Sequence, residues 1–182
     1  MQKFLSNRET LCYCITTGKR DLEKEDYVRK EFWSGETFFV LPNGHRHGPS
    51  EEKCEDEILH CLWKDGELHG PWTFEKDGQI EGEGNYEHGK KIGPERRYHN
   101  GVICSHKDFL DDKIHGLFVV FWRSGKLNHI AEYASGKKHG LEAHFNNEGS
   151  VMRVYENRDG EQTQLPFEVC FLLLKKIQNL LN

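Results

Sequence analysis

Residues 70–93 read GPWTFEKDGQIEGEGNYEHGKKIG, and this stretch decides the fold. Trp72, Phe74, Ile80 and Tyr86 are its main apolar side chains. They lie in two runs of about six residues, and each run ends in a turn pair that tolerates positive φ. The pattern predicts a β-hairpin. Because one hairpin alone is only marginally stable in water, it needs further hairpins in the same sheet.

The rest of the chain supplies those hairpins as a repeat. His-Gly pairs recur along the chain, and Ile92-Gly93 stands where one of them is missing. The glycines of these pairs, Gly48, Gly70, Gly93, Gly116 and Gly140, are 22, 23, 23 and 24 residues apart. A fixed period of this length is the signature of a repeat protein.

Two further sets of turn residues divide each repeat. One set lies four residues before the glycine of the His-Gly position, where Asp111-Asp112 once replaces a glycine, and the other lies inside the unit. We expect structural turns at Gly44, Gly48, Gly66, Gly70, Gly78, Gly89, Gly93, Gly101, Gly116, Gly125, Gly136, Gly140 and Gly149. The expected fold is mainly β: an elongated antiparallel meander of stacked β-hairpin repeats over residues 36–164.

The two ends differ from the array. Residues 1–35 are expected to form a β cap that protects the first sheet edge, although residues 21–25 could open a short helix. Residues 165–182 are expected to form an amphipathic helix, because Phe167, Phe171, Leu174, Ile177 and Leu181 recur at helical spacing after Pro166. A lone helix of this length is marginal, so its apolar face must pack on the last hairpin, a partner groove or a second copy.

Composition narrows the function. The net charge of −5 argues against nucleic-acid binding, which needs clustered Lys and Arg. Neither a signal peptide nor an apolar run long enough to span a bilayer is visible, so we expect a protein that is not secreted and has no transmembrane segment. Cysteines are scattered without a CxxC pair, which predicts free thiols.

The many histidines could be metal ligands, but their spacing along the chain does not favour this. His47, His69, His115 and His139 share one repeat position, about two strands or 10 Å apart, which is too far for common ligation. They are expected to be structural turn residues, with His45 and His47 the one pair close enough to reconsider. The chain has no nucleophile elbow, phosphate loop or HExxH, so we assign no catalytic, metal or cofactor-binding residues and expect no cofactor and no enzyme activity.

These features resemble MORN repeats and the related MORN-variant repeat, whose units of about 23 residues carry Gly-x-aromatic, an Asn/Asp-Gly turn and Tyr-x-x-Gly. The resemblance covers residues 36 to 160, and the best units begin at Gly70 and Gly116. Residues 1–10 and the segment from Phe38 to Ser50 resemble the MORN-repeat proteins that giant viruses of the marseillevirus group encode in many copies.

Three functions follow as expectations. The first is a non-enzymatic interaction and assembly module, which the viral resemblance sharpens to a minor capsid or capsid-associated protein in the virion or the infected cytoplasm. Its partners would be capsid proteins or a second copy. The second is a host-directed adaptor or antitoxin-like binder, and the third, which the charge disfavours, is membrane-surface binding. Candidate interface residues are Trp33, Trp63, Trp72 and Trp122 with the helix residues named above, although each tryptophan could instead be core.

Overall fold

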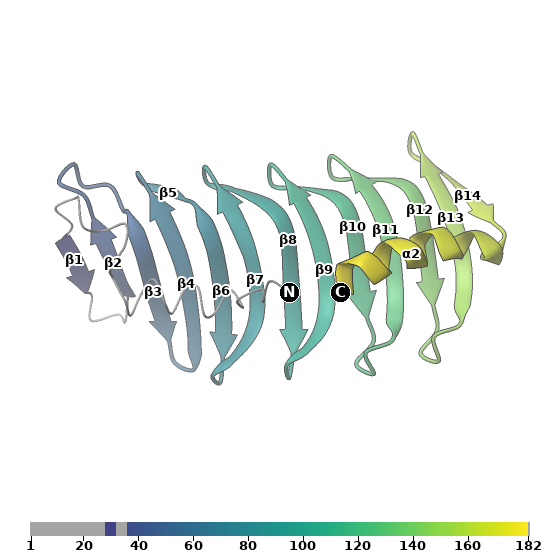
Figure 1. The fold of residues 1–182 in the computed structure, drawn as a ribbon, viewed down its shortest axis with the longest axis horizontal. Coiled ribbons are helices and arrows are strands. Elements are labelled where there is room, and N and C mark those ends of the chain that lie inside the picture. Colours follow the sequence, from purple (N-terminus) through teal and green to yellow (C-terminus); the bar gives the residue numbers. More distant parts are fainter. Residues whose placement is uncertain (1–27, 32–35, 182) are drawn as a thin grey trace. The chain divides into compact units, whose positions relative to one another are not determined.

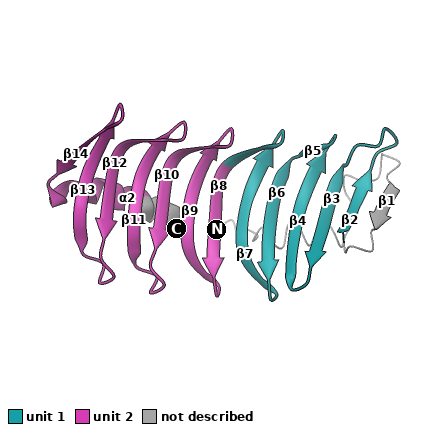
Figure 2. Cartoon of the chain, turned by 180° about the vertical axis from the view of Figure 1, so that it is seen from behind, with its two compact units in different colours: residues 1–92 teal, residues 93–182 magenta. Residues whose placement is uncertain are grey.

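The structure is a computed structural model that describes residues 28–31 and 36–181, with side chains described for residues 36–176. It is mainly β, with antiparallel strands that follow one another in a meander and a short helix at the end (Figure 1). The chain divides into two compact units, residues 1–92 and 93–182 (Figure 2). The expected fold class of hairpin repeats followed by a C-terminal helix is confirmed.

The first unit is a meander in the order β1-β2-β3-β4-β6-β7, with the short β5 paired to β4. The strands are β1 (Val28–Glu31), β2 (Glu36–Val40), β3 (Gly48–Cys54), β4 (Glu57–Lys64), β5 (Glu67–Leu68), β6 (Gly70–Lys76) and β7 (Gln79–Glu87). β1 falls within the expected amino-terminal cap and is a strand. The remainder of the cap, including Trp33 and the alternative helix at residues 21–25, lies outside the described residues.

The second unit continues the same pattern and ends in the helix. Its strands are β8 (Lys90–His99), which begins just before the unit boundary, β9 (Val102–Leu110), β10 (Lys113–Phe121), β11 (Leu127–Ala134), β12 (Lys137–Phe145), β13 (Val151–Arg158) and β14 (Glu161–Leu165). A 3-10 turn, η1 (Phe167–Val169), leads into the helix α2 (Cys170–Leu181). Among the described residues, no helix is long and apolar enough to cross a lipid bilayer.

Three repeats are tied to the one before them through a turn glycine. The amide N–H of this glycine donates a 2.8 Å hydrogen bond to the carbonyl oxygen two residues before the glycine of the preceding His-Gly pair. The bonds are Gly66 to Arg46, Gly89 to Leu68 and Gly136 to Ile114. The main-chain hydrogen bonds therefore recur with the same period as the sequence.

The histidine of the His-Gly pair contacts the same turn. The N–H of Asp65 donates to Nδ1 of His47, and the N–H of Ser135 donates to Nδ1 of His115, both at 3.3 Å. His69 instead places its ring edge-on to His88, the equivalent turn residue, with ring centroids 5.4 Å apart. The expectation that these histidines are structural turn residues is confirmed for His47, His69 and His115.

The glycine of the pair lies at a β-bulge. Strand pairing shifts register between Ile114 and Phe118, and Gly116 has φ of +111°. The bulge leaves the N–H of Leu117 to donate to Oδ2 of Asp108 at 2.9 Å, and a Cβ on Gly116 would lie 3.0 Å from Cβ of Asp108. Gly140 repeats this arrangement over Glu132. Each glycine assigned to a turn has positive φ, but Gly48, Gly70, Gly93, Gly116 and Gly140 lie within strands, so the expectation of turns at these five positions is wrong.

The core of the second unit lies between the sheet and α2. Val119, Ile130, Ala143 and Val154 are buried on the sheet face that the helix covers. The helix contributes Cys170 and Leu173, and Lys176 of α2 pairs with Glu132 of β11. The helix therefore packs on the last hairpins of its own chain, which was one of the three arrangements the sequence left open.

We predict that Gly116→Ala lowers the free energy of unfolding by about 3 kcal/mol, because a left-handed alanine costs 1–2 kcal/mol and the Asp108 to Leu117 hydrogen bond adds about 1 kcal/mol. Urea denaturation measures it. Gly125→Ala is the matched control: φ is +78° there but no atom lies within 4 Å of the added Cβ, so about 1 kcal/mol is expected. Equal losses in the two variants would contradict a role for the bulge.

Candidate functional site

The structure separates the candidate interface tryptophans. Trp72 is only 5% exposed and Gly84 leaves room for its ring, since a Cβ there would lie 2.7 Å from Nε1 of Trp72. Burial makes Trp72 a core residue of the first unit, so its assignment as an interface residue is wrong for the isolated chain. Trp63 is half-buried, donates from Nε1 to Oγ of Ser50 at 2.9 Å, and has Arg46 5.1 Å over its ring.

Trp122 is the exposed member of the set, at 37%. It follows β10 and lines a surface hollow of about 570 Å³ at the turn end of the second unit. The hollow is lined by Tyr98, His99, Asn100, Val102, Ile103, Cys104, Phe121, Trp122 and Arg123. Val102 is also exposed, so this hollow presents apolar surface to solvent.

The candidate residues of the helix divide between its two sides. Phe167 and Phe171 are exposed, and Leu172, which the sequence did not assign to an interface, is exposed as well. Leu174 packs against the core cluster. The side chains of Ile177 and Leu181 lie outside the described part of the helix.

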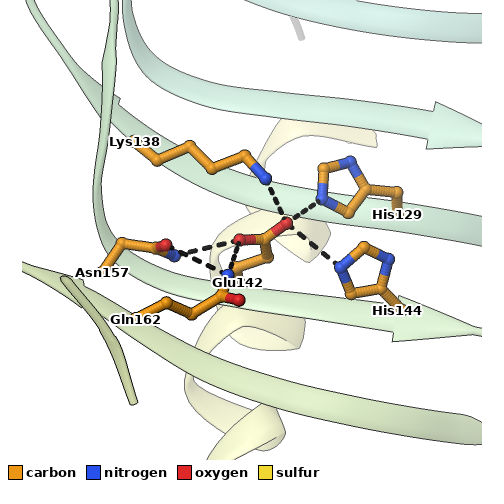
Figure 3. A network of polar contacts seen from close by, with 6 residues as sticks. All are labelled: His129, Lys138, Glu142, His144, Asn157 and Gln162. Carbon is orange, nitrogen blue, oxygen red and sulfur yellow. Dashed lines mark hydrogen bonds and ion pairs between the residues drawn. The ribbon is translucent and has the colours of Figure 1, made fainter. Parts of the chain in front are cut away.

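A buried polar cluster lies on the opposite face of the second unit's sheet. Successive residues of a strand point to opposite faces, and Ala143 faces the core under α2, so Glu142 faces away from the helix. Glu142 is nevertheless 0% exposed, because side chains from β11, β12, β13 and β14 surround it (Figure 3). We call Glu142, His129, His144, Lys138, Asn157 and Gln162 the Glu142 cluster.

Each carboxylate oxygen of Glu142 has its own set of donors. Oε1 accepts from Nζ of Lys138 at 2.5 Å, Nε2 of His129 at 2.8 Å and Nε2 of His144 at 3.1 Å. Oε2 accepts from Nδ2 of Asn157 and Nε2 of Gln162, both at 3.0 Å. A buried carboxylate with this many donors is held as the anion.

The titration of the cluster follows from these contacts. Burial alone would raise the pKa of Glu142, but hydrogen bonds from Lys138, His129 and Asn157 and the Lys138 charge outweigh it and lower this pKa to about 2. Burial is the main cause that lowers the pKa of His129. At neutral pH the cluster therefore contains a carboxylate, an ammonium group and a neutral His129 imidazole.

The two imidazoles belong to a row of rings across the strands. His129 stacks on His144 with centroids 4.5 Å apart, Phe118 contacts His129 edge-on at 5.7 Å, and Tyr155 contacts His144 at 6.0 Å. This row fixes both rings with Nε2 toward Glu142. The ligand atoms that His129, Glu142 and His144 can offer all lie within 4.8 Å of one another, a spacing that a single metal ion could bridge.

Sequence reasoning missed this cluster. It considered the histidines of the repeated His-Gly position, whereas His129 and His144 lie inside strands, where the register pairs them directly. The available signal was Glu142 and His144 two residues apart, which places both side chains on one face of a strand. Finding His129 opposite them required the register of the neighbouring strand.

Two buried histidines of the described chain, His60 and His106, also lie beside carboxylates. Nε2 of His106 is 2.9 Å from Oδ1 of Asp108, and hydrogen bonds from His106 and from the Leu117 amide outweigh burial and lower the Asp108 pKa. In the first unit, His60 lies between Glu51 and Glu75 at 3.6 and 3.8 Å. Neither group brings a second histidine to the same carboxylate oxygen.

Comparison with known proteins gives no family. No family model and no curated protein matches the chain. Two solved structures of TarM, one from S. aureus in complex with fondaparinux, alpha-GlcNAc-glycerol and UDP, resemble it at a TM-score of 0.24. The identities are 12% and 13%; 83% and 93% of this chain are covered, but only 24% and 29% of the TarM chains. A TM-score this low does not indicate a shared function.

We predict that Glu142→Gln destabilises the chain by about 3 kcal/mol at pH 7. The amide nitrogen of the glutamine is itself a hydrogen-bond donor and would face other buried donors without an acceptor. Since the Glu142 pKa is lowered in the folded chain, wild-type stability from this group is present above its ordinary value of 4.5 and is lost as the pH falls toward 2. Urea denaturation between pH 7 and pH 2.5 should show a flatter acid limb for the variant.

Glu156→Gln is the control for this prediction. Glu156 is on the neighbouring strand β13 and pairs only with the exposed Arg158 at 2.9 Å among the contacts described here. Loss of such a surface pair should cost less than about 1 kcal/mol. An acid limb that is as steep in Glu142→Gln as in wild type would contradict the assignment of the low pKa to Glu142.

Proposed function

We propose that the chain is a non-enzymatic protein-interaction and assembly module, and that the outer side of α2 contacts its protein partner. The observation that supports this most directly is the exposure of Phe171 and Leu172, at 52% and 44%, on a helix whose other side is anchored in the core. A helix that only capped the sheet would gain nothing from apolar side chains in water. Grouped exposed apolar residues mark interaction sites.

The chemistry of this surface suits a protein. Phe167 precedes the helix and is also exposed, so two aromatic rings and a leucine are available as anchors. Nζ of Lys175 lies 5.4 Å from the centre of the Phe171 ring, which adds a charged rim beside the apolar residues. An apolar centre with a polar rim is the usual arrangement of a protein interface. The hollow beside Trp122 offers a second apolar contact in the same unit.

The specific form of the proposal comes from the resemblance to MORN-repeat proteins of marseillevirus-group viruses. Such a chain would act as a minor capsid or capsid-associated protein that binds larger shell proteins, located in the virion or in the infected cytoplasm. Cross-linking mass spectrometry on particles purified from the source tests this form. Stoichiometric recovery with cross-links from Lys175 or Lys176 to a shell protein would support it. Recovery only in the soluble fraction would instead favour a host-directed adaptor.

We predict that the double variant Phe171→Ser, Leu172→Ser weakens binding to the cross-linked partner at least about 30-fold, because loss of a central apolar anchor typically costs 2 kcal/mol or more. Surface plasmon resonance with the purified partner measures this. Met152→Ser is the control, since Met152 is an exposed apolar residue of β13 and not of the helix. The unfolding free energies of both variants should match wild type. Equal affinity in the double variant and wild type would exclude the outer side of α2.

A further inference from the structure

We propose that His129, Glu142 and His144 form a binding site for a divalent transition-metal ion, with Zn²⁺ the best fit, and that the Lys138 ammonium group takes the place of the metal in the metal-free chain. The site is distinct from the exposed apolar surface of α2, since it lies on the other face of the sheet. It requires no residue of the proposed protein interface.

The donor set is the first argument. Two imidazole nitrogens and one carboxylate oxygen converge on one point, with Nε2 of His129 and His144 at 2.8 and 3.1 Å from Oε1 of Glu142. Imidazole suits zinc, copper and nickel, and two histidines with one glutamate form a known type of three-ligand zinc site that keeps a fourth position open. Mg²⁺ and Ca²⁺ prefer all-oxygen ligands, so this set does not fit them.

The support around the donors is the second argument. Oε2 of Glu142 accepts from Asn157 and Gln162, which orients the carboxylate and leaves Oε1 directed at the two rings. The stack of His129 on His144 and the flanking ring of Tyr155 fix the imidazoles. Outer contacts that orient the ligands in this way are what a metal site needs beyond the ligands themselves.

Lys138 is the third argument. Its ammonium group already places a positive charge 2.5 Å from Oε1, beside both imidazole nitrogens. The Lys138 side chain is 38% exposed, whereas that of Glu142 is 1% exposed, so the ammonium group can move into solvent while the carboxylate stays in place. Replacement of one cation by another keeps Glu142 neutralised throughout, and its Oε2 keeps the hydrogen bonds from Asn157 and Gln162.

The surface beside Lys138 provides a route for this exchange. A hollow of about 710 Å³ is lined by Lys137, Lys138, His139, Asn157, Asp159 and Glu161, with Ala134 and Gly160. Lys138 and Asn157 belong both to this hollow and to the Glu142 cluster, so solvent reaches the cluster here. Asp159 and Glu161 give the displaced ammonium group an acidic environment.

The proton balance of the exchange is simple. In the metal-free chain each imidazole donates from Nε2 to Glu142; on metal binding each ring moves its proton from Nε2 to Nδ1, so that the Nε2 lone pair binds the ion. Lys138 leaves as the ammonium ion, and the exchange requires no oxidant, reductant or other reactant.

The test is titration of the chelator-treated full chain with Zn²⁺ by isothermal calorimetry, and with Co²⁺ by absorption spectroscopy. We expect one ion per chain and a cobalt spectrum without the thiolate charge-transfer band that cysteine ligation would give. His144→Ala should weaken binding at least about tenfold. Lys138→Met removes the competing cation and should tighten binding several-fold, a direction that a purely structural cluster does not predict.

His139→Ala is the matched control, because His139 lines the same hollow but is not a ligand. It should bind Zn²⁺ as wild type does. Far-ultraviolet circular dichroism of each variant checks that the sheet is intact. If His144→Ala does not fold, Lys138→Met still tests the proposal, because it retains all three ligands. The proposal is overturned if wild type binds no Zn²⁺, if Lys138→Met binds no more tightly, or if His139→Ala weakens binding as much as His144→Ala.

Discussion

The hydrogen bond from a turn glycine to the repeat before it, seen at Gly66, Gly89 and Gly136, is the constraint on which the described array depends. A two-residue turn exposes amide N–H groups that must find acceptors. In these three bonds the acceptor is the carbonyl just before the preceding His-Gly pair. The spacing between glycines is thus fixed by main-chain geometry.

Because the main chain sets the register, one repeat position can carry very different side chains. The residue two positions after the His-Gly glycine is Trp72 in one unit, Phe118 in another and Glu142 in a third. Trp72 and Glu142 are both buried, the first against Gly84 and the second among hydrogen-bond donors. Burial is thus possible at this position for an apolar and for a charged residue, and the neighbouring side chains decide which of them is stable there.

The sequence predicts the features that lie within one repeat, but it does not predict which residues of neighbouring strands pair with each other. Hairpins, turns and the C-terminal helix follow from glycine spacing and periodicity, which act within one repeat. The Glu142 cluster depends on strand register: His129 pairs with His144, and an irregularity between Ala131 and Tyr133 brings Lys138 to pair with Tyr133 instead of the residue that regular pairing would give. The helix shows the same limit. Cys170 and Leu173 are buried whereas Phe171 and Leu172 are exposed, and the apolar periodicity does not separate these two pairs.

The Glu142 cluster is hard to explain as a device for stability alone. A buried ion pair often stabilises a fold no more than well-packed apolar residues of similar volume, because desolvation offsets the attraction. The same scaffold accepts Trp72 and Phe118 at the equivalent position, so an apolar alternative is compatible with the repeat. Its histidines also converge on Oε1, the oxygen that Lys138 contacts, while Asn157 and Gln162 hold the other oxygen. Packing alone does not require the histidines and the lysine to share one carboxylate oxygen. Exchange of the lysine for another cation does require it.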